Sequence, residues 1–245
     1  MEYILPILFL FISFIYSSLG LGGGSSYTAL MAIMGINYQL IPTTSLTLNL
    51  VVTFIGMINF WRNGHGRFNL VAPFLITSVP MAYIVGTLHL PELLFQIILI
   101  ITLIFVLVRI YLFDGLAISY QLSNTERWLL TICLGAVLGF IAGAVGIGGG
   151  VYLVPLIIMF GLGSTKEASA AGAMFIWANS LAGLIARFQS ATYEIKFILP
   201  LICAVVVGGF TGSYFGSIKY DAKTIQKIMG VVIIVAIFFL IERIL

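Results

Sequence analysis

Gly20-Leu21-Gly22-Gly23-Gly24 is the stretch that decides the fold, because it recurs as Gly146-Ile147-Gly148-Gly149-Gly150. The second copy lies 126 residues after the first, and Gly35 recurs as Gly161 at the same spacing. Both copies interrupt long apolar stretches of the chain. The recurrence therefore predicts two structural repeats that are each built around a glycine-rich turn.

The composition on either side of these turns is that of a membrane protein. Of the 245 residues, 61% are hydrophobic and 8% are charged, whereas soluble domains carry about 25% charged residues. This excludes disordered and disulfide-rich secreted proteins. The formal charge of +3 belongs to loop residues, so it requires no nucleic acid as a partner. The partners that we expect are membrane lipid, a small anion and a second copy of the chain.

The apolar runs divide at glycines, prolines and charged clusters into ten segments. They cover about residues 3–20, 24–36, 43–62, 68–89, 92–113, 124–145, 149–162, 167–188, 194–217 and 222–244. Each segment should be helical, because lipid tolerates only helices and closed barrels, and the strict alternation of barrel strands is missing. We therefore expect an all-α polytopic membrane protein with a single transmembrane domain over residues 1–245.

The ten segments form two sets of five, in repeats over about residues 1–115 and 123–245. An odd number of crossings in each repeat gives the two repeats opposite orientations, which is the inverted arrangement of secondary transporters. Segments 24–36 and 149–162 are short, at about 20 Å against a hydrocarbon core of about 30 Å. We expect each to be a half-helix or a re-entrant piece that follows its glycine-rich turn.

The distribution of basic residues predicts the orientation of the ten segments. One side carries eight of them, Arg62, Arg67, Arg109, Arg127, Lys166, Lys219, Lys223 and Lys227, and the other side carries Arg187, Lys196 and Arg243. An eight-segment arrangement divides the same residues seven to four. The ten-segment layout therefore fits the positive-inside rule better. It predicts a protein of the cytoplasmic (inner) membrane with both termini on the side away from the cytoplasm. Full crossings and re-entrant hairpins leave every loop on the same side, so both alternatives remain open.

The glycine-rich turns are also the strongest candidates for a binding site. The candidate residues are Gly22, Gly23, Gly24, Gly148, Gly149 and Gly150. Glycines at a sharp turn leave backbone N–H groups accessible, and the helix that begins there adds the positive end of its dipole. Such a helix start binds anions without a charged side chain. The alternative interpretation is that these glycines only allow helices to pack closely.

Polar side chains lie near the turns and would supplement them as hydrogen-bond donors. The candidates are Ser25, Ser26, Thr44, Ser45, Asn49, Ser169 and Asn179. An Asn inside a membrane span is costly unless it is paired, so its presence indicates either binding or an interhelical hydrogen bond. The Ser and Thr hydroxyls have the further alternative of bonding to their own helix backbone.

The sequence lacks the residues that several kinds of chemistry require. No Asp or Glu lies in the middle of a predicted segment, which argues against a carboxylate proton relay and against an enzyme that uses paired acids. No His or Cys cluster has metal-ligand spacing, and no Walker motif is present. We therefore expect neither a metal nor a cofactor.

The second repeat carries the residues of a known family. Its motif continues from Gly146 through Tyr152 and Pro155 to Gly161, and then with Lys166-Glu167-Ala168 and Asn179-Ser180-Leu181-Ala182-Gly183. The first repeat keeps the glycines but has Ser25-Ser26-Tyr27, with no proline after it, and Thr53 where the second has Asn179. With its duplicated turn, the chain resembles the sulfite exporter TauE/SafE family, also called the toluene sulfonate uptake permease family, over nearly its whole length.

This resemblance implies transport of small anions such as sulfite, thiosulfate and sulfonates, with carboxylates carried by some members. We therefore expect a secondary transporter of sulfite or a related sulfur oxyanion or organosulfonate that works by alternating access. A carrier of carboxylates or other organic anions, and an anion channel of the same architecture, are the alternatives.

Overall fold

The computed structural model describes residues 4–88, 90–112, 123–188, 194–218, 230–231, 233–234 and 237–238. Within these residues the protein is all helical and contains no strand. The predicted tenth segment, about residues 222–244, lies mostly outside the described residues, as do Lys219, Lys223 and Lys227. Nine helices are therefore available for comparison with the other nine predicted segments.

Each of those segments corresponds to one helix. The helices are α1 (Ile4–Ser17), α2 (Gly24–Ile33), α3 (Leu40–Arg62), α4 (Phe68–Gly86), α5 (Glu92–Leu112), α6 (Asn124–Val145), α7 (Gly150–Met159), α8 (Thr165–Arg187) and α9 (Ile195–Ile218). The largest difference at a helix start is in α3, which begins at Leu40 rather than at residue 43 because Pro42 is accommodated in the first helical turn. The helices α2 and α7 have ten residues each, in agreement with the short segments expected there.

Five of the described helices are long and apolar enough to cross a membrane, namely α3, α4, α6, α8 and α9. Of these, α3 and α8 are the most buried, whereas α4 and α9 are the least buried. The large exposed side chains are apolar ones such as Phe11, Phe54 and Phe210. An outer surface of this kind is suited to lipid, and the protein is a multi-pass membrane protein.

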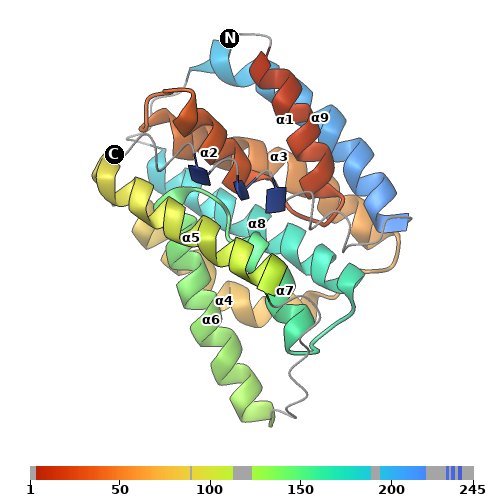
Figure 1. Ribbon diagram of the computed structural model, residues 1–245. Helices are drawn as coiled ribbons and strands as arrows, with labels where there is room; N and C mark the ends of the chain where they lie inside the picture. The colour runs from red at the N-terminus through yellow and green to blue at the C-terminus, as the bar shows by residue number, and fades with distance from the viewer. Residues whose placement is uncertain are drawn as a thin grey trace.

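Six of the described helices pack in a continuous row (Figure 1). The order of neighbours is α1, α9, α3, α8, α4 and α6. Consequently α3 and α8 form the centre, and each is flanked by a helix that the sequence assigns to the other predicted repeat. The half-length helices α2 and α7 pack near this centre, on α3 and α8 respectively.

Glycines let the outer pairs of helices approach closely. On α6, Gly135, Gly139 and Gly143 face the backbone of α4, and a Cβ at Gly143 would lie 2.7 Å from the Ala82 carbonyl oxygen. On α9, Gly208, Gly212 and Gly216 face α1 in the same way. Small residues every fourth position are the usual device for close helix contact in lipid. Because the contacts advance together along both helices, α4 runs parallel to α6 and α1 runs parallel to α9.

Two helix starts on the same side of the protein have the capping boxes that the sequence predicts. Ser123 caps α6 and forms its box with Glu126. Ser164 caps α8 and forms its box with Glu167. Each serine hydroxyl accepts a backbone N–H while the glutamate accepts the N–H of the serine. Arg67 also forms an ion pair with Glu167 at 3.1 Å, which ties the start of α4 to that of α8. The predicted cap at Asp221 lies outside the described residues.

Candidate anion-binding site

The two glycine-rich turns adopt matching backbone conformations. Gly23 has φ +86° and is the residue before α2, and Gly149 has φ +73° and is the residue before α7. Gly20 and Gly146 also have positive φ, at +71° and +75°. Only glycine adopts this left-handed region without strain, so the backbone shape recurs at these two positions. The turns differ between them, since Gly148 has φ +78° and its counterpart Gly22 has no positive φ.

The structure brings the two turns into contact at the centre of the molecule. Ser45 on α3 donates a hydrogen bond to the Gly146 carbonyl oxygen at 3.0 Å and lies 3.3 Å from the Gly24 carbonyl oxygen. A Cβ added at Gly24 would lie 2.8 Å from the Ile147 carbonyl oxygen. Backbone segments more than 100 residues apart in the sequence therefore touch, and one hydroxyl group bridges them.

Asn49, one turn further along α3, also lies between the two turns. Its Nδ2 donates to the Ile147 carbonyl oxygen at 3.1 Å, and Cβ atoms built at Gly22 and Gly24 would collide with its amide. The side chain is fully buried, and its Oδ1 has no hydrogen-bond partner among the described residues. A buried amide oxygen without a hydrogen-bond partner lowers stability by about 1–3 kcal/mol. Such oxygens are few in native proteins, so this one calls for an explanation such as a functional role.

The helices α2 and α7 begin directly after the two turns, and neither start has a side-chain cap. Neither Gly23 nor Gly149 caps its helix through a side chain, since glycine has none. The first N–H groups of any helix lack partners within the helix, so those at Gly24, Ser25, Gly150 and Val151 are available to another acceptor. Gly22, Gly23, Gly24, Gly148, Gly149 and Gly150 are all buried, which strengthens their interaction with a charge.

Ser25 and Ser26 follow the first turn but are held by another residue. The hydroxyl of Tyr16 on α1 lies 2.7 Å from Ser26 Oγ and accepts a hydrogen bond from Ser25 Oγ at 3.2 Å. All three side chains are buried. Tyr16 therefore fixes both serines and is a residue of the candidate site that the sequence does not reveal.

The second turn has different polar neighbours. A Cβ at Gly148 would lie 3.1 Å from Ser180 Oγ and 3.4 Å from Asn49 Nδ2. Ser180 is fully buried, and its hydroxyl has no partner among the described residues, as is also true of the Thr44 hydroxyl on α3. Ser180 thus belongs to the neighbourhood of the turn more directly than its neighbour Asn179.

Asn179 and Ser169 lie on α8 but make other contacts. Asn179 Nδ2 donates to Ser78 Oγ at 3.1 Å and to the Phe175 carbonyl oxygen at 2.8 Å, so this amide joins α8 to α4. Ser169 is buried, and its backbone packs against Gly20. For Gly20 the close-packing interpretation of the glycines therefore holds.

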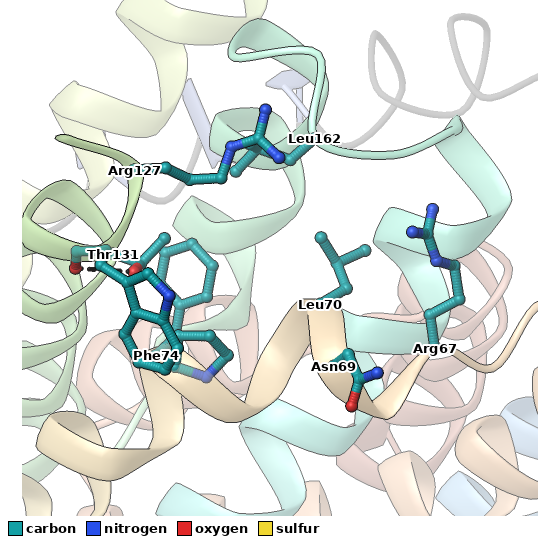
Figure 2. A pocket seen from close by; sticks show the side chains of 9 residues that line it. Arg67, Asn69, Leu70, Phe74, Arg127, Thr131 and Leu162 are labelled. Carbon is teal, nitrogen blue, oxygen red and sulfur yellow. Dashed lines mark hydrogen bonds between the residues drawn. The ribbon is translucent and has the colours of Figure 1, made fainter. Parts of the chain in front are cut away.

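Two cavities open at opposite ends of the protein. One, of about 190 Å³, lies between the starts of α4 and α6 and the turn after α7. Figure 2 shows Arg67 and Arg127 on different elements around it, with the Thr131 hydroxyl bonded to the Trp128 carbonyl oxygen at 2.9 Å. The other cavity, of about 260 Å³, lies beside the turn between α2 and α3, where Pro42 and Thr43 line it.

The family model for "Sulfite exporter TauE/SafE" matches residues 5–240, nearly the whole chain. The chain belongs to the TauE/SafE family. This confirms the resemblance found in the duplicated glycine motif. The TauE/SafE family is a family of membrane transporters.

Curated relatives of this TauE/SafE protein are described as transporters. The "Probable membrane transporter protein y4hK" of Sinorhizobium fredii is 31% identical over 234 residues, covering 95% of each chain. The "Probable membrane transporter protein YjnA" of Bacillus subtilis is 28% identical over 243 residues, covering 93% of this chain and 94% of the relative. No solved structure matches the chain significantly.

Proposed function

We propose that this protein is a secondary transporter that carries a small anion, sulfite or a related sulfur oxyanion or organosulfonate, across the cytoplasmic membrane. The observation that carries the proposal is the buried contact between the two glycine-rich turns, each followed by a helix start, with Ser45 and Asn49 bonded between them. Backbone N–H groups and two positive helix ends attract an anion there without a buried cation. The description of the matching family as sulfite exporters supports the choice of substrate.

The packing order of the helices supports inverted repeats. If α1, α3 and α4 correspond to α6, α8 and α9, the row α1, α9, α3, α8, α4, α6 becomes its own reverse under the exchange. The two half-length helices are exchanged in the same way. Rocking of one half against the other would then expose the shared centre alternately to each side, which is the alternating-access scheme.

A counterflow assay in proteoliposomes tests the function. Vesicles loaded with unlabelled sulfite should accumulate labelled sulfite transiently above its external concentration, because a carrier exchanges substrate across the membrane. Thiosulfate, a small sulfonate, acetate and citrate serve as competitors that define the substrate class. A conductive flux with no counterflow would show an anion channel, and competition by carboxylates alone would replace sulfur oxyanions as the substrate class.

The proposed orientation puts the turn after α3 in the cytoplasm and the turn before α3 outside. In a background with Cys133→Ser and Cys203→Ser, we expect Gly64→Cys to resist a membrane-impermeant maleimide in intact cells and Gln39→Cys to react. A Cβ at Gly64 meets no atom within 4 Å, and Gln39 is exposed, so both positions have room for the label. The reverse pattern would invert the orientation.

Glu167 is proposed to stabilise a helix start rather than to carry protons. Glu167→Gln should lower the free energy of unfolding by about 1 kcal/mol, because the capping box and the ion pair with Arg67 are weakened. Sulfite flux driven by a pH gradient should remain within about twofold of wild type. The same result is expected for Glu194→Gln, which neutralises the carboxylate directly before α9. Loss of the gradient-driven flux with exchange preserved would make Glu167 a proton carrier.

A further inference from the structure

We infer that the cavity beside the turn between α2 and α3 is the vestibule through which the transported anion reaches the central site, and that Arg187 selects for negative charge there. The inference rests on the proposed function and adds an entry site and a specificity-determining residue to it. This cavity, called the α2–α3 vestibule below, is lined by Tyr38, Gln39, Pro42, Thr43, Gly86, Leu88, Leu90, Pro91, Phe95, Ala144 and Arg187.

The size of the α2–α3 vestibule suits a small hydrated anion. Its volume is about 260 Å³, whereas one water molecule occupies about 30 Å³ in the liquid. Its wall is mostly apolar, formed by Leu88, Leu90 and Phe95 among others. An apolar wall beside one cation lowers the local dielectric constant, so that the field of the cation reaches further than it would in water.

Arg187 is oriented toward this space by the helices that meet there. It is the last residue of α8, and its guanidinium donates to the Gly183 carbonyl oxygen at 3.3 Å and to the Gly143 carbonyl oxygen on α6. A Cβ at Gly86 would lie 3.0 Å from Arg187 Nη1, so a glycine at the end of α4 makes room for the guanidinium. These backbone carbonyls fix the position of the group.

Residues of α3 that line the α2–α3 vestibule adjoin the central site. Pro42 lines the cavity and also lies against the second glycine-rich turn, since a Cβ at Gly146 would be 2.9 Å from Pro42 Cα. The next residue, Thr43, lines the cavity with a buried hydroxyl that has no hydrogen-bond partner among the described residues. Two residues later, Ser45 donates to the Gly146 carbonyl oxygen. Less than one turn of α3 therefore separates the vestibule from the proposed anion site.

Thiol labelling measures the field of Arg187 without requiring transport. In the background lacking Cys133 and Cys203, Gln39→Cys places a thiol on the exposed rim of the vestibule. The rates of its reaction with a negatively charged sulfonatoethyl and a positively charged trimethylammonioethyl methanethiosulfonate give a charge-preference ratio. We expect Arg187→Gln to lower this ratio about tenfold, and Arg187→Lys to retain most of it.

A matched control uses the equivalent end of the other central helix. Arg62 is the last residue of α3, as Arg187 is of α8, but it lies at the opposite end of the molecule. Arg62→Gln should leave the charge-preference ratio of the Gln39→Cys thiol unchanged. An equal effect of the two substitutions would show a response to net charge alone and would overturn the role of Arg187, and an unreactive thiol in the Gln39→Cys variant would overturn the vestibule itself.

Transport kinetics separate this inference from the proposed function. In sulfite counterflow, Arg187→Gln should raise KM about tenfold with kcat within about twofold, and Arg187→Lys should restore KM, because Arg187 acts on entry rather than on the central site. Absence of counterflow in the wild-type protein would overturn the proposed function and with it the vestibule. Normal wild-type counterflow, with KM and the labelling ratio unchanged in Arg187→Gln, would overturn the vestibule alone.

Discussion

Gly24→Ala should reduce the affinity for the transported anion at least about tenfold and leave the protein folded in the membrane. Gly24 is the first residue of α2 and has no left-handed backbone, so alanine is compatible with its conformation. The added methyl group would collide with the Asn49 amide and lie 2.8 Å from the Ile147 carbonyl oxygen. Overpacking of this kind costs about 1–3 kcal/mol of stability. Displacement of the Asn49 amide and the α2 start would also cost the bound anion a hydrogen bond, about 1.5–3 kcal/mol, and 1.4 kcal/mol is tenfold in affinity.

Gly56→Ala is the matched control for this substitution. Gly56 lies on α3, beside the same central helices, but a Cβ there would be 3.9 Å from the Cβ atoms of Ala173 and Ser213, which is ordinary contact distance. Both variants should appear in the membrane at wild-type amounts, and sulfite binding should fall only in Gly24→Ala. Equal sulfite affinity in the two variants would place the anion away from the contact between the turns.

Asn49→Leu should abolish measurable sulfite counterflow. Leucine has a similar branched outline, although it is larger, and it loses the hydrogen bond from Nδ2 to Ile147 and the amide oxygen beside Gly22. Loss of one partner of a buried hydrogen bond costs about 1–3 kcal/mol, and the site also loses a donor for the anion. The change is measured as the initial rate of counterflow at saturating sulfite, together with the sulfite Kd of the detergent-purified protein.

Asn59→Leu gives the comparison that isolates binding from folding. Asn59 is also a buried asparagine of α3, but it donates to Ser213 on α9 at 2.7 Å, away from the turns. Its substitution should lower thermal stability by a similar amount and leave sulfite affinity unchanged. If both asparagine variants lost stability equally and kept their affinity, Asn49 would be a structural residue only.

The helices were predictable because apolar composition and the residues that begin or end a helix define them locally. Long apolar runs end at Asn63–Arg67 or begin at the Ser-x-x-Glu boxes, and the structure has helix ends at the same places. The glycine turns were predictable for the same reason, since their backbone shape depends on residues within the turn. The span 222–244 and the orientation in the membrane stay predictions.

The pairing of residues across the centre was not predictable from the sequence. Ser45 and Asn49 reach carbonyl groups 101 and 98 residues away, and no local pattern specifies such contacts. Tyr16 lies in an ordinary apolar helix, and nothing in the sequence around it marks it as a site residue. Its contacts with Ser25 and Ser26 depend on how α1 packs against α2.

Asn179 illustrates why matching residue types in two repeats is an unsafe guide to position. The offset of 126 residues between the two glycine motifs makes Asn179 the counterpart of Thr53, one turn after Asn49, rather than of Asn49 itself. Asn179 bonds to Ser78 on α4, whereas Asn49 bonds to Ile147 in the second glycine-rich turn.

Anomalous X-ray diffraction from crystals grown with selenite tests the central claim most directly. Selenite has the charge and pyramidal shape of sulfite, and its selenium atom can be located without assuming where it binds. The account predicts a selenium peak beside Asn49, with the oxyanion about 3 Å from backbone nitrogen atoms at the start of α2, of α7 or of both. Selenium peaks found only elsewhere, for example between Arg67 and Arg127, would contradict an anion site between the two glycine-rich turns.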